Sequence, residues 1–203
     1  MPQEHYFSNE PLGEFRAKTI EVTLAGKRVS VETAGSIFSP DHVDTGTAVL
    51  LELLEEAPAI GDVLDIGCGW GPIALSIALS RPHVTVWAID VNERALELTR
   101  RNAEKLGLKN VKVCQPGEVP KGLKFSGIWS NPPIRVGKEV LHDILKDWLP
   151  RLDTGAEGYL VVQKNLGADS LHRWLQDVLP KKFNCIRLET SKSFRVLRVT
   201  NKN

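Results

Sequence analysis

Residues 63–72 constrain the fold of this chain more than any other stretch. They read Val-Leu-Asp-Ile-Gly-Cys-Gly-Trp-Gly-Pro, so a short apolar segment gives way to a glycine at every second position. This pattern predicts a buried strand, a tight loop and a helix that begins near Pro72, because proline is tolerated in the first turn of a helix. Glycines let backbone amides approach a ligand closely, and the helix N-terminus adds a partial positive charge. A loop of this kind usually binds a cofactor that contains adenosine.

The spacing of the glycines indicates which cofactor the loop binds. A dinucleotide fingerprint, Gly-x-Gly-x-x-Gly counted from Gly67, would need a glycine where this chain has Pro72. The chain instead has Asp-x-Gly-x-Gly-x-Gly from Asp65 onward, and a carboxylate there would repel phosphates but suit a cationic amino-acid tail. This order resembles motif I of the class I methyltransferases that use S-adenosylmethionine (SAM). The resemblance implies that SAM is bound by Asp65, Gly67, Cys68 and Gly69.

Strands and helices are expected to alternate from residue 63 onward. Further buried strands are predicted at 84–90, 111–114, 127–130 and 158–162, with helical spacing of apolar residues between most of them. This alternation indicates an α/β fold with a parallel, doubly wound sheet. Two last strands, near 185–189 and 194–200, are close enough in sequence to form an antiparallel hairpin.

The chain before this sheet is expected to form a small extension. Apolar and polar residues alternate between positions 20 and 31 around Ala25 and Gly26, which predicts a β-hairpin. A helical, largely buried pattern follows up to about residue 56, and Asp44 or Thr45 would serve as its N-cap. We therefore expect an N-terminal extension with a β-hairpin over residues 1–35 and a SAM-dependent methyltransferase domain over residues 36–203.

Asp90 comes at the end of the second predicted strand of the sheet. Ligands of open α/β sheets bind outside the carboxyl ends of the strands, where a carboxylate can accept both hydroxyls of a ribose. We expect Asp90 and the adjoining Val91 to contact SAM. The alternative, that Asp90 caps the helix predicted from residue 94, does not exclude the ribose contact.

Residues 130–134 read Ser-Asn-Pro-Pro-Ile and follow the fourth predicted strand. Each proline removes a backbone donor and fixes φ, so this turn presents acceptors with almost no competing N–H groups. Such an edge suits an amino group whose two hydrogens face the enzyme while the nitrogen lone pair faces the methyl group. The side-chain oxygen of Asn131 and the carbonyl of Pro132 would accept those hydrogens, most strongly as the N–C bond forms. We expect Asn131, Pro132 and Pro133 to form the catalytic turn, with Asn131 also touching SAM.

Together the glycine loop and this proline turn resemble the methyltransferases that act on exocyclic amines. Within them, the chain resembles the "small" methyltransferase domain of the RsmC type, the rRNA guanine-N2 enzymes. Further stretches fit this resemblance over nearly the whole chain: residues 5–8, 38–39, 44–47, 135–138 and 161–164. The resemblance implies a Rossmann-like, seven-stranded, mostly parallel sheet with helices on both faces. It also implies methyl transfer from SAM to the N2 amino group of a guanine in small-subunit (16S) rRNA, with the RNA or the subunit as partner.

Two positions depart from that family's pattern. Ser126 follows Phe125 where the family usually has an aspartate, and Pro116 stands where it tends to carry a residue that meets the adenine. Gln115 and Glu118 are the alternatives for the adenine contact.

The substrate side of the site is expected to contain Ile134, Arg135 and Lys138. Many adenine-N6 and glutamine-N5 enzymes have an aromatic residue in place of Ile134, so the isoleucine favours a guanine substrate. The guanidinium of Arg135 would then stack on the base, and Lys138 would contact phosphate. Two alternatives stay open: a methyltransferase for another amine, either adenine N6 or a protein glutamine amide, and a SAM- or RNA-binding partner without turnover.

Composition narrows the class of protein further. The 203 residues carry a net charge of +1, yet seven Lys or Arg lie between positions 181 and 203 against one acid. Such a tail is compatible with two interpretations, a surface that faces RNA phosphates and a merely solvated basic face. No stretch is long and apolar enough for a membrane span and no signal-peptide pattern is present, which predicts a cytoplasmic protein. Three cysteines and five histidines show neither disulfide nor metal-ligand spacing, so we expect no metal. We expect a monomer or a weak dimer.

Overall fold

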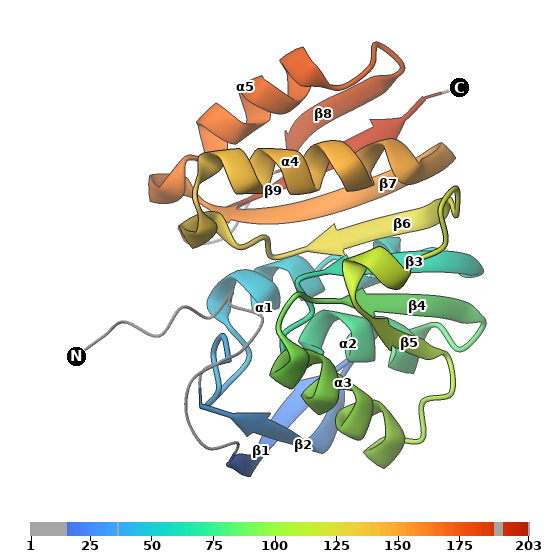
Figure 1. Cartoon of the computed structure of the whole chain (residues 1–203), viewed down its shortest axis with the longest axis vertical. Coiled ribbons are helices and arrows are strands. Elements are labelled where there is room, and N and C mark those ends of the chain that lie inside the picture. Colours follow the sequence, from blue (N-terminus) through green and yellow to red (C-terminus); the bar gives the residue numbers. More distant parts are fainter. Residues whose placement is uncertain (1–15, 36, 189–192, 203) are drawn as a thin grey trace.

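A computed structural model describes residues 16–35, 37–188 and 193–202, without the side chain of Arg135. Its centre is a seven-stranded sheet in the order β5-β4-β3-β6-β7-β9-β8 (Figure 1). The strands are β3 Gly61–Ile66, β4 Val84–Ile89, β5 Val111–Cys114, β6 Phe125–Ser130, β7 Leu152–Gln163, β8 Phe183–Leu188 and β9 Phe194–Asn201. Pairings from β5 through β7 are parallel, whereas β9 runs antiparallel to both β7 and β8. The predicted Rossmann-like sheet and its antiparallel C-terminal hairpin are confirmed.

The order of the strands creates a crevice beside β3. The chain moves outward from β3 to β4 and β5, and then returns to place β6 on the other side of β3. At such a reversal of strand order, the connections that follow the two adjacent strands lead away in opposite directions. This leaves room for a ligand at the carboxyl ends of the strands. The glycine loop after β3 and the proline turn after β6 both lie at this edge.

Within the described part of the chain, five α-helices cover the two faces of the sheet: α1 Thr45–Leu51, α2 Pro72–Ser80, α3 Glu93–Lys105, α4 Lys138–Trp148 and α5 Ala168–Val178. Adjacent residues of β3 point to opposite faces, as the alternation of a strand requires. Val63 packs in the cluster that contains residues of α1, α2 and α3, whereas Leu64 packs in the cluster with α4 and α5. Both side chains are fully buried, which explains the continuous apolar run of this strand.

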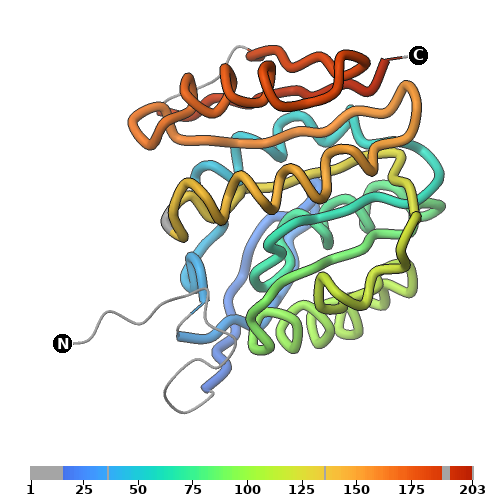
Figure 2. The backbone as a smooth tube through the Cα atoms, turned by 45° about the horizontal axis from the view of Figure 1, so that its top comes forward, coloured from blue at the N-terminus to red at the C-terminus, as the bar shows by residue number. Residues whose placement is uncertain are grey.

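The predicted N-terminal hairpin is also present. β1 Ala17–Leu24 and β2 Lys27–Ala34 form a separate antiparallel pair that turns at Ala25 and Gly26, both with positive φ. Its apolar side packs with residues of α2 and α3. In Figure 2 the blue hairpin and the golden helix α4 lie on opposite sides of the sheet. Asn102 of α3 connects the hairpin to the glycine loop, because its Nδ2 donates to the carbonyls of Glu32 (2.9 Å) and Trp70 (3.0 Å).

Two element boundaries differ clearly from the sequence prediction: β7 begins at Leu152, six residues before the predicted strand, and α1 ends at Leu51 rather than near residue 56. The second strand of the sheet ends at Ile89, so Asp90 already belongs to the loop. The alternative role of Asp90, as the cap of the next helix, is wrong: the helix after β4 is capped by Asn92, whose side chain accepts from the N–H of Arg94 at 3.0 Å. Of the two residues predicted as the N-cap of the first helix, Asp44 and Thr45, the structure shows Asp44 in this role for α1. No helix in the described ranges is long and apolar enough to cross a membrane.

Candidate active site

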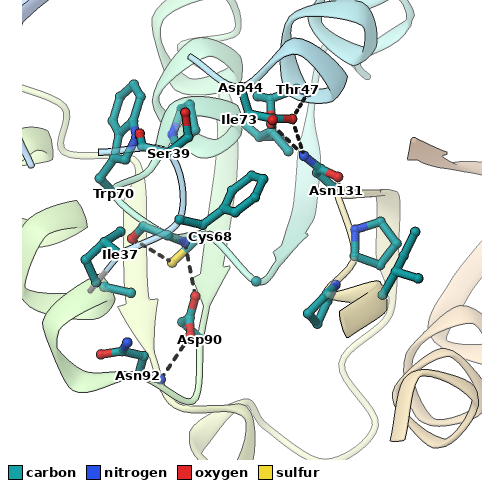
Figure 3. Close-up of a pocket in the computed structure, with 18 of the residues that line it drawn as sticks. Ile37, Ser39, Asp44, Thr47, Cys68, Trp70, Ile73, Asp90, Asn92 and Asn131 are labelled. Carbon is teal, nitrogen blue, oxygen red and sulfur yellow. Dashed lines mark hydrogen bonds between the residues drawn. The ribbon is translucent and has the colours of Figure 1, made fainter. Parts of the chain in front are cut away.

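A cavity of about 200 Å³ opens at the carboxyl ends of β3, β4 and β6 (Figure 3). Its walls come from the glycine loop, from the ends of β4 and β6, from the start of α1 and from the segment before α1. Of the predicted site residues, it is lined by Gly67, Cys68, Gly69, Asp90, Asn131, Pro132, Pro133 and Ile134. The structure thus brings together the two motifs that the sequence places more than sixty residues apart.

The glycine loop owes its shape to positive φ angles at Gly67, Gly69 and Gly71. The N–H groups of Gly67 and Cys68 both donate to the carbonyl of Ile89, at 2.9 and 3.0 Å, which anchors the loop to the end of β4. A Cβ at Gly69 would meet nothing within 4 Å, whereas one at Gly71 would lie 3.1 Å from Leu75 and from Thr99. The backbone at Gly69 is therefore open to a ligand, and Gly71 is required by the packing of α2 against α3.

Asp65 lies beneath this loop and is not among the residues that line the cavity. Its side chain is fully buried, and Oδ2 accepts from the N–H of Ala74 at 3.0 Å. The carboxylate therefore caps the first turn of α2 from the end of β3, because the residue at the N-cap, Gly71, has no side chain to do so. Burial raises the pKa of Asp65 to about 8, the Ala74 hydrogen bond opposes this rise, and the charge of Asp90 adds to it.

Asp90 lines the cavity and is held by backbone donors on both oxygens. Oδ2 accepts from Gly69 N at 3.0 Å and Oδ1 accepts from Asn92 N at 2.9 Å. Burial raises its pKa, while the N–H groups of Asn92, Gly69 and Val91 lower it. Each carboxylate oxygen keeps acceptor capacity for a further donor. Val91 itself is 41% exposed and is not part of the cavity wall.

Asn131 is fixed by two acceptors at the start of α1. Its Nδ2 donates to Asp44 Oδ2 at 2.9 Å and to Thr47 Oγ1 at 3.1 Å, as Figure 3 shows. Its Oδ1 has no hydrogen-bond partner among the described residues. The strand that carries it is tied to β3, since Ser130 Oγ donates to the carbonyl of Ile66 at 2.7 Å. The turn therefore offers the cavity a fixed acceptor.

The predicted substrate residues lie further out. Ile134 lines both this cavity and a smaller one beside it, whose wall includes Lys138. Lys138 is exposed at the first position of α4. The side chain of Arg135 lies outside the described residues, so its predicted stacking has no structural account.

Sequence reasoning did not assign a role in the site to several residues that form the cavity. Asp44, Thr47, Phe38 and Gln163 lie in stretches that fit the family resemblance, but no role in the site was expected for them. Ile37 and Phe194 lie in no such stretch, so only the fold could reveal that they line the cavity. Gln115 and Glu118, the alternatives for the adenine contact, form a reciprocal cap of a 3₁₀ turn, and neither lines the cavity.

Comparison with known proteins identifies the family. The family model described as the methyltransferase small domain matches residues 28–198. The chain belongs to the methyltransferase small domain family. A Bacillus subtilis member, the uncharacterised protein YbxB, is 38% identical over 178 residues, which cover 86% of this chain and 89% of YbxB. This methyltransferase small domain protein is thus a SAM-dependent methyltransferase, with SAM as its cofactor.

Other relatives of this small domain methyltransferase carry the RsmC name. Ribosomal RNA small subunit methyltransferase C from Shewanella halifaxensis is 29% identical over 143 residues, which cover 68% of this chain and 41% of that protein. The solved structure of Thermus thermophilus 16S rRNA N2 G1207 methyltransferase (RsmC), with AdoMet and guanosine, superposes with a TM-score of 0.77 at 21% identity. It matches 96% of this chain and 52% of its own, and it shows the shared fold. The chain spans about half the length of these RsmC proteins.

Proposed function

We propose that this protein transfers the methyl group of SAM to the exocyclic N2 amino group of a guanine in 16S rRNA. One observation carries the proposal: both hydrogens of the Asn131 amide are bound by Asp44 and Thr47, and its oxygen has no partner among the described residues. A fixed acceptor beside a proline turn without competing donors fits a substrate group that donates two hydrogens. The RsmC name of the relatives supports guanine N2 in 16S rRNA as the specific acceptor.

The cofactor side of the cavity fits SAM. Gly69 has open space where a side chain would project, so the loop from Gly67 to Gly69 would lie against the cofactor. Asp90 would hold the ribose, because both carboxylate oxygens keep acceptor capacity, whereas Val91 lies beside it outside the cavity wall. Asp65 lies beneath the loop and outside the cavity wall, so it would contribute to SAM binding by holding the first turn of α2 under the loop rather than by direct contact. When bound, SAM supplies an electrophilic methyl group on a sulfonium.

The proline turn would activate the amine without a strong base. Asn131 Oδ1 and the carbonyl of Pro132 would accept the two amino hydrogens and draw the nitrogen lone pair out of the conjugated ring. These hydrogen bonds strengthen as positive charge develops on nitrogen, so they stabilise the transition state more than the ground state. As the new N–C bond forms, the bond from sulfur to the methyl group would break and leave a thioether, and the methylated nitrogen would release one proton to solvent. Pro133 would keep the turn extended and free of a competing N–H.

A guanine in folded RNA must leave its stack to reach this cavity. Ile134 would contact the displaced base, and Arg135 and Lys138 would contact the base or the adjoining phosphates. These contacts at the outer wall are the RNA-binding part of the proposal.

The test is methyl transfer from labelled SAM to small ribosomal subunits from a strain that lacks this protein. We expect N2-methylguanosine in the rRNA with the wild-type enzyme and a loss of about a hundredfold or more in Asn131→Ala, because a transition-state acceptor is removed. Asn184→Ala makes the same chemical change on the edge strand β8, away from the cavity, and serves as control. Label in tRNA or in a release factor instead would show a different amine substrate. Tight SAM binding without transfer to any of these would indicate a non-catalytic partner.

A further inference from the structure

The start of α1 contacts the proline turn although eighty-four or more residues separate them in sequence. Asp44 is the N-cap of α1, and its Oδ2 accepts from the N–H groups of Gly46 (2.8 Å) and Thr47 (3.2 Å). The same oxygen accepts from Nδ2 of Asn131. One carboxylate thus caps a helix and binds the amide of the catalytic turn.

The hydrogen-bond partners of the Asn131 amide determine its orientation. An oxygen that already accepts two backbone N–H bonds is an acceptor, so the amide must present its nitrogen to it. The second amide hydrogen is bound by Thr47 Oγ1. Since an amide nitrogen has only two hydrogens, both are used, and the oxygen is turned away from Asp44 and Thr47.

This pair of acceptors is itself rigidly held. Thr47 is only 3% exposed, and Gly46 is buried beside Phe194 of β9. A Cβ at Gly46 would lie 2.8 Å from Phe194 Cε1 and 3.0 Å from Asp44 Oδ2, so there is no room at this position for a side chain. The absence of a side chain at Gly46 therefore lets Asp44 and Phe194 pack closely.

We propose that Asp44 and Thr47 are positioning residues for methyl transfer, which hold the Asn131 amide so that its oxygen accepts a hydrogen of the substrate amine. The carboxylate also polarises the amide, because a hydrogen bond donated by its nitrogen increases the electron density on its oxygen. This inference rests on the proposed function for the nature of the substrate. The orientation of the amide itself does not depend on which amine is methylated.

Matched substitutions separate positioning from capping. Asp44→Ser keeps an N-cap residue but is too short to reach Asn131, whereas Asp44→Asn keeps both the length and the acceptor oxygen. Thr47→Val removes the acceptor at nearly constant shape, and Thr47→Ser keeps it. We expect kcat to fall about tenfold or more in Asp44→Ser and severalfold in Thr47→Val, with the KM for RNA and the affinity for SAM within about twofold of wild type. Asp44→Asn and Thr47→Ser should retain most of the activity.

A double substitution shows whether Asp44 acts through Asn131. In an Asn131→Ala background, Asp44→Ser should lower kcat no further, because the group that it positions is already gone. A full additional loss would show that Asp44 acts independently of Asn131 and would overturn the proposal. An Asp44→Ser enzyme with unchanged kcat and only a lowered melting temperature would show that Asp44 is a structural cap.

A measurement without substrate distinguishes failure of this proposal from failure of the proposed function. The two side-chain N–H protons of Asn131 can be assigned in a ¹⁵N–¹H spectrum by their loss in Asn131→Ala. We expect both protons to be shifted and protected from exchange in the wild type, and Asp44→Ser to move one of them towards free-amide values. If rRNA is not methylated, the guanine proposal is wrong and this spectrum alone decides the positioning: unchanged Asn131 signals in Asp44→Ser would overturn it.

Discussion

The two sides of the cavity are built in different ways. The cofactor side, with the glycine loop and Asp90, comes from a continuous stretch between β3 and the start of α3, and its bonds are mostly made by backbone amides. The acceptor side combines the start of α1, the turn after β6 and the first residue of β9, and its key bonds join side chains. A cofactor common to many enzymes can be bound by a local motif, whereas the group that contacts the substrate depends on how distant segments meet.

The largest expected effect is a loss of stability, and it tests whether the glycine loop on the cofactor side requires a residue without a side chain. Gly71 has φ of +97° and a Cβ there would press on Leu75 and Thr99 at 3.1 Å. Gly71→Ala should therefore lower the free energy of unfolding by about 2–4 kcal/mol, from backbone strain and overpacking together. Urea unfolding monitored by tryptophan fluorescence measures this.

Gly69→Ala is the matched control for that substitution. Its φ of +58° is also positive, but nothing lies within 4 Å of the added carbon, so only the backbone cost of about 1–2 kcal/mol is expected. Its larger consequence should be weaker SAM binding, since the added methyl occupies the open side of the loop. Equal destabilisation by the two substitutions would show that packing at α2 is not what requires Gly71.

Asp90→Ala should weaken SAM binding by about ten- to a hundredfold, because a charged acceptor for the ribose hydroxyls is lost. Isothermal titration calorimetry with SAM measures the change. Asn131→Ala is the comparison from the other side of the cavity and should change SAM affinity much less than it changes methyl transfer. If the two variants lose SAM affinity equally, the division of the cavity into a cofactor side and an acceptor side fails.

This division also explains how much of the molecule the sequence could predict. The α/β fold, the antiparallel C-terminal strands, the hairpin and SAM as cofactor were all predictable, because each depends on local periodicity or on one contiguous motif. Asp65 and Asp90 looked alike in the sequence, as acids at the ends of neighbouring strands. Only the fold separates them, since Asp65 faces the first turn of α2 and Asp90 faces the cavity.

The acceptor side was predictable only in part. Asn131 and the prolines form a motif, but the contact from Asp44 is long-range and looks in sequence like an ordinary helix cap. The packing of Phe194 on Gly46 depends on β9 lying between β7 and β8, an arrangement that no local pattern encodes. Contacts between distant segments are consequences of topology, which single-segment patterns do not specify.

The burial of Asp65 gives the cofactor side a pH-dependent stability. Its pKa in the folded protein is about 8, against 3.8 for the exposed group, so between these values the folded state binds a proton that the unfolded state has released. The free energy of unfolding should therefore fall as pH rises through this window, by up to about 1.4 kcal/mol per pH unit from this group. The full contribution is present below pH 3.8 and is lost as pH approaches about 8.

Asp65→Asn removes this titration while keeping an oxygen for the N–H of Ala74. Urea unfolding at a series of pH values should give a flatter profile for the variant between pH 5 and 8 than for the wild type, with the variant at least as stable at the upper end. Parallel profiles would mean that Asp65 is ionised in the folded protein across this range, and that its charge is compensated within the loop.

The smallest expected effect concerns the outer wall of the acceptor side. Lys138 is exposed at the start of α4 beside Ile134, where it would meet a phosphate of the RNA. Lys138→Ala should weaken RNA binding severalfold and reduce the slope of log K against log salt by about 0.7–0.9, the value for one phosphate contact. Lys109, exposed near the start of β5 at the opposite edge of the sheet, provides the control Lys109→Ala. If the salt slope changes equally in both variants, the effect reflects net charge alone. A change confined to Lys138→Ala would show that Lys138 contacts RNA, so that the acceptor side includes both the contacts at Asn131 and this outer surface.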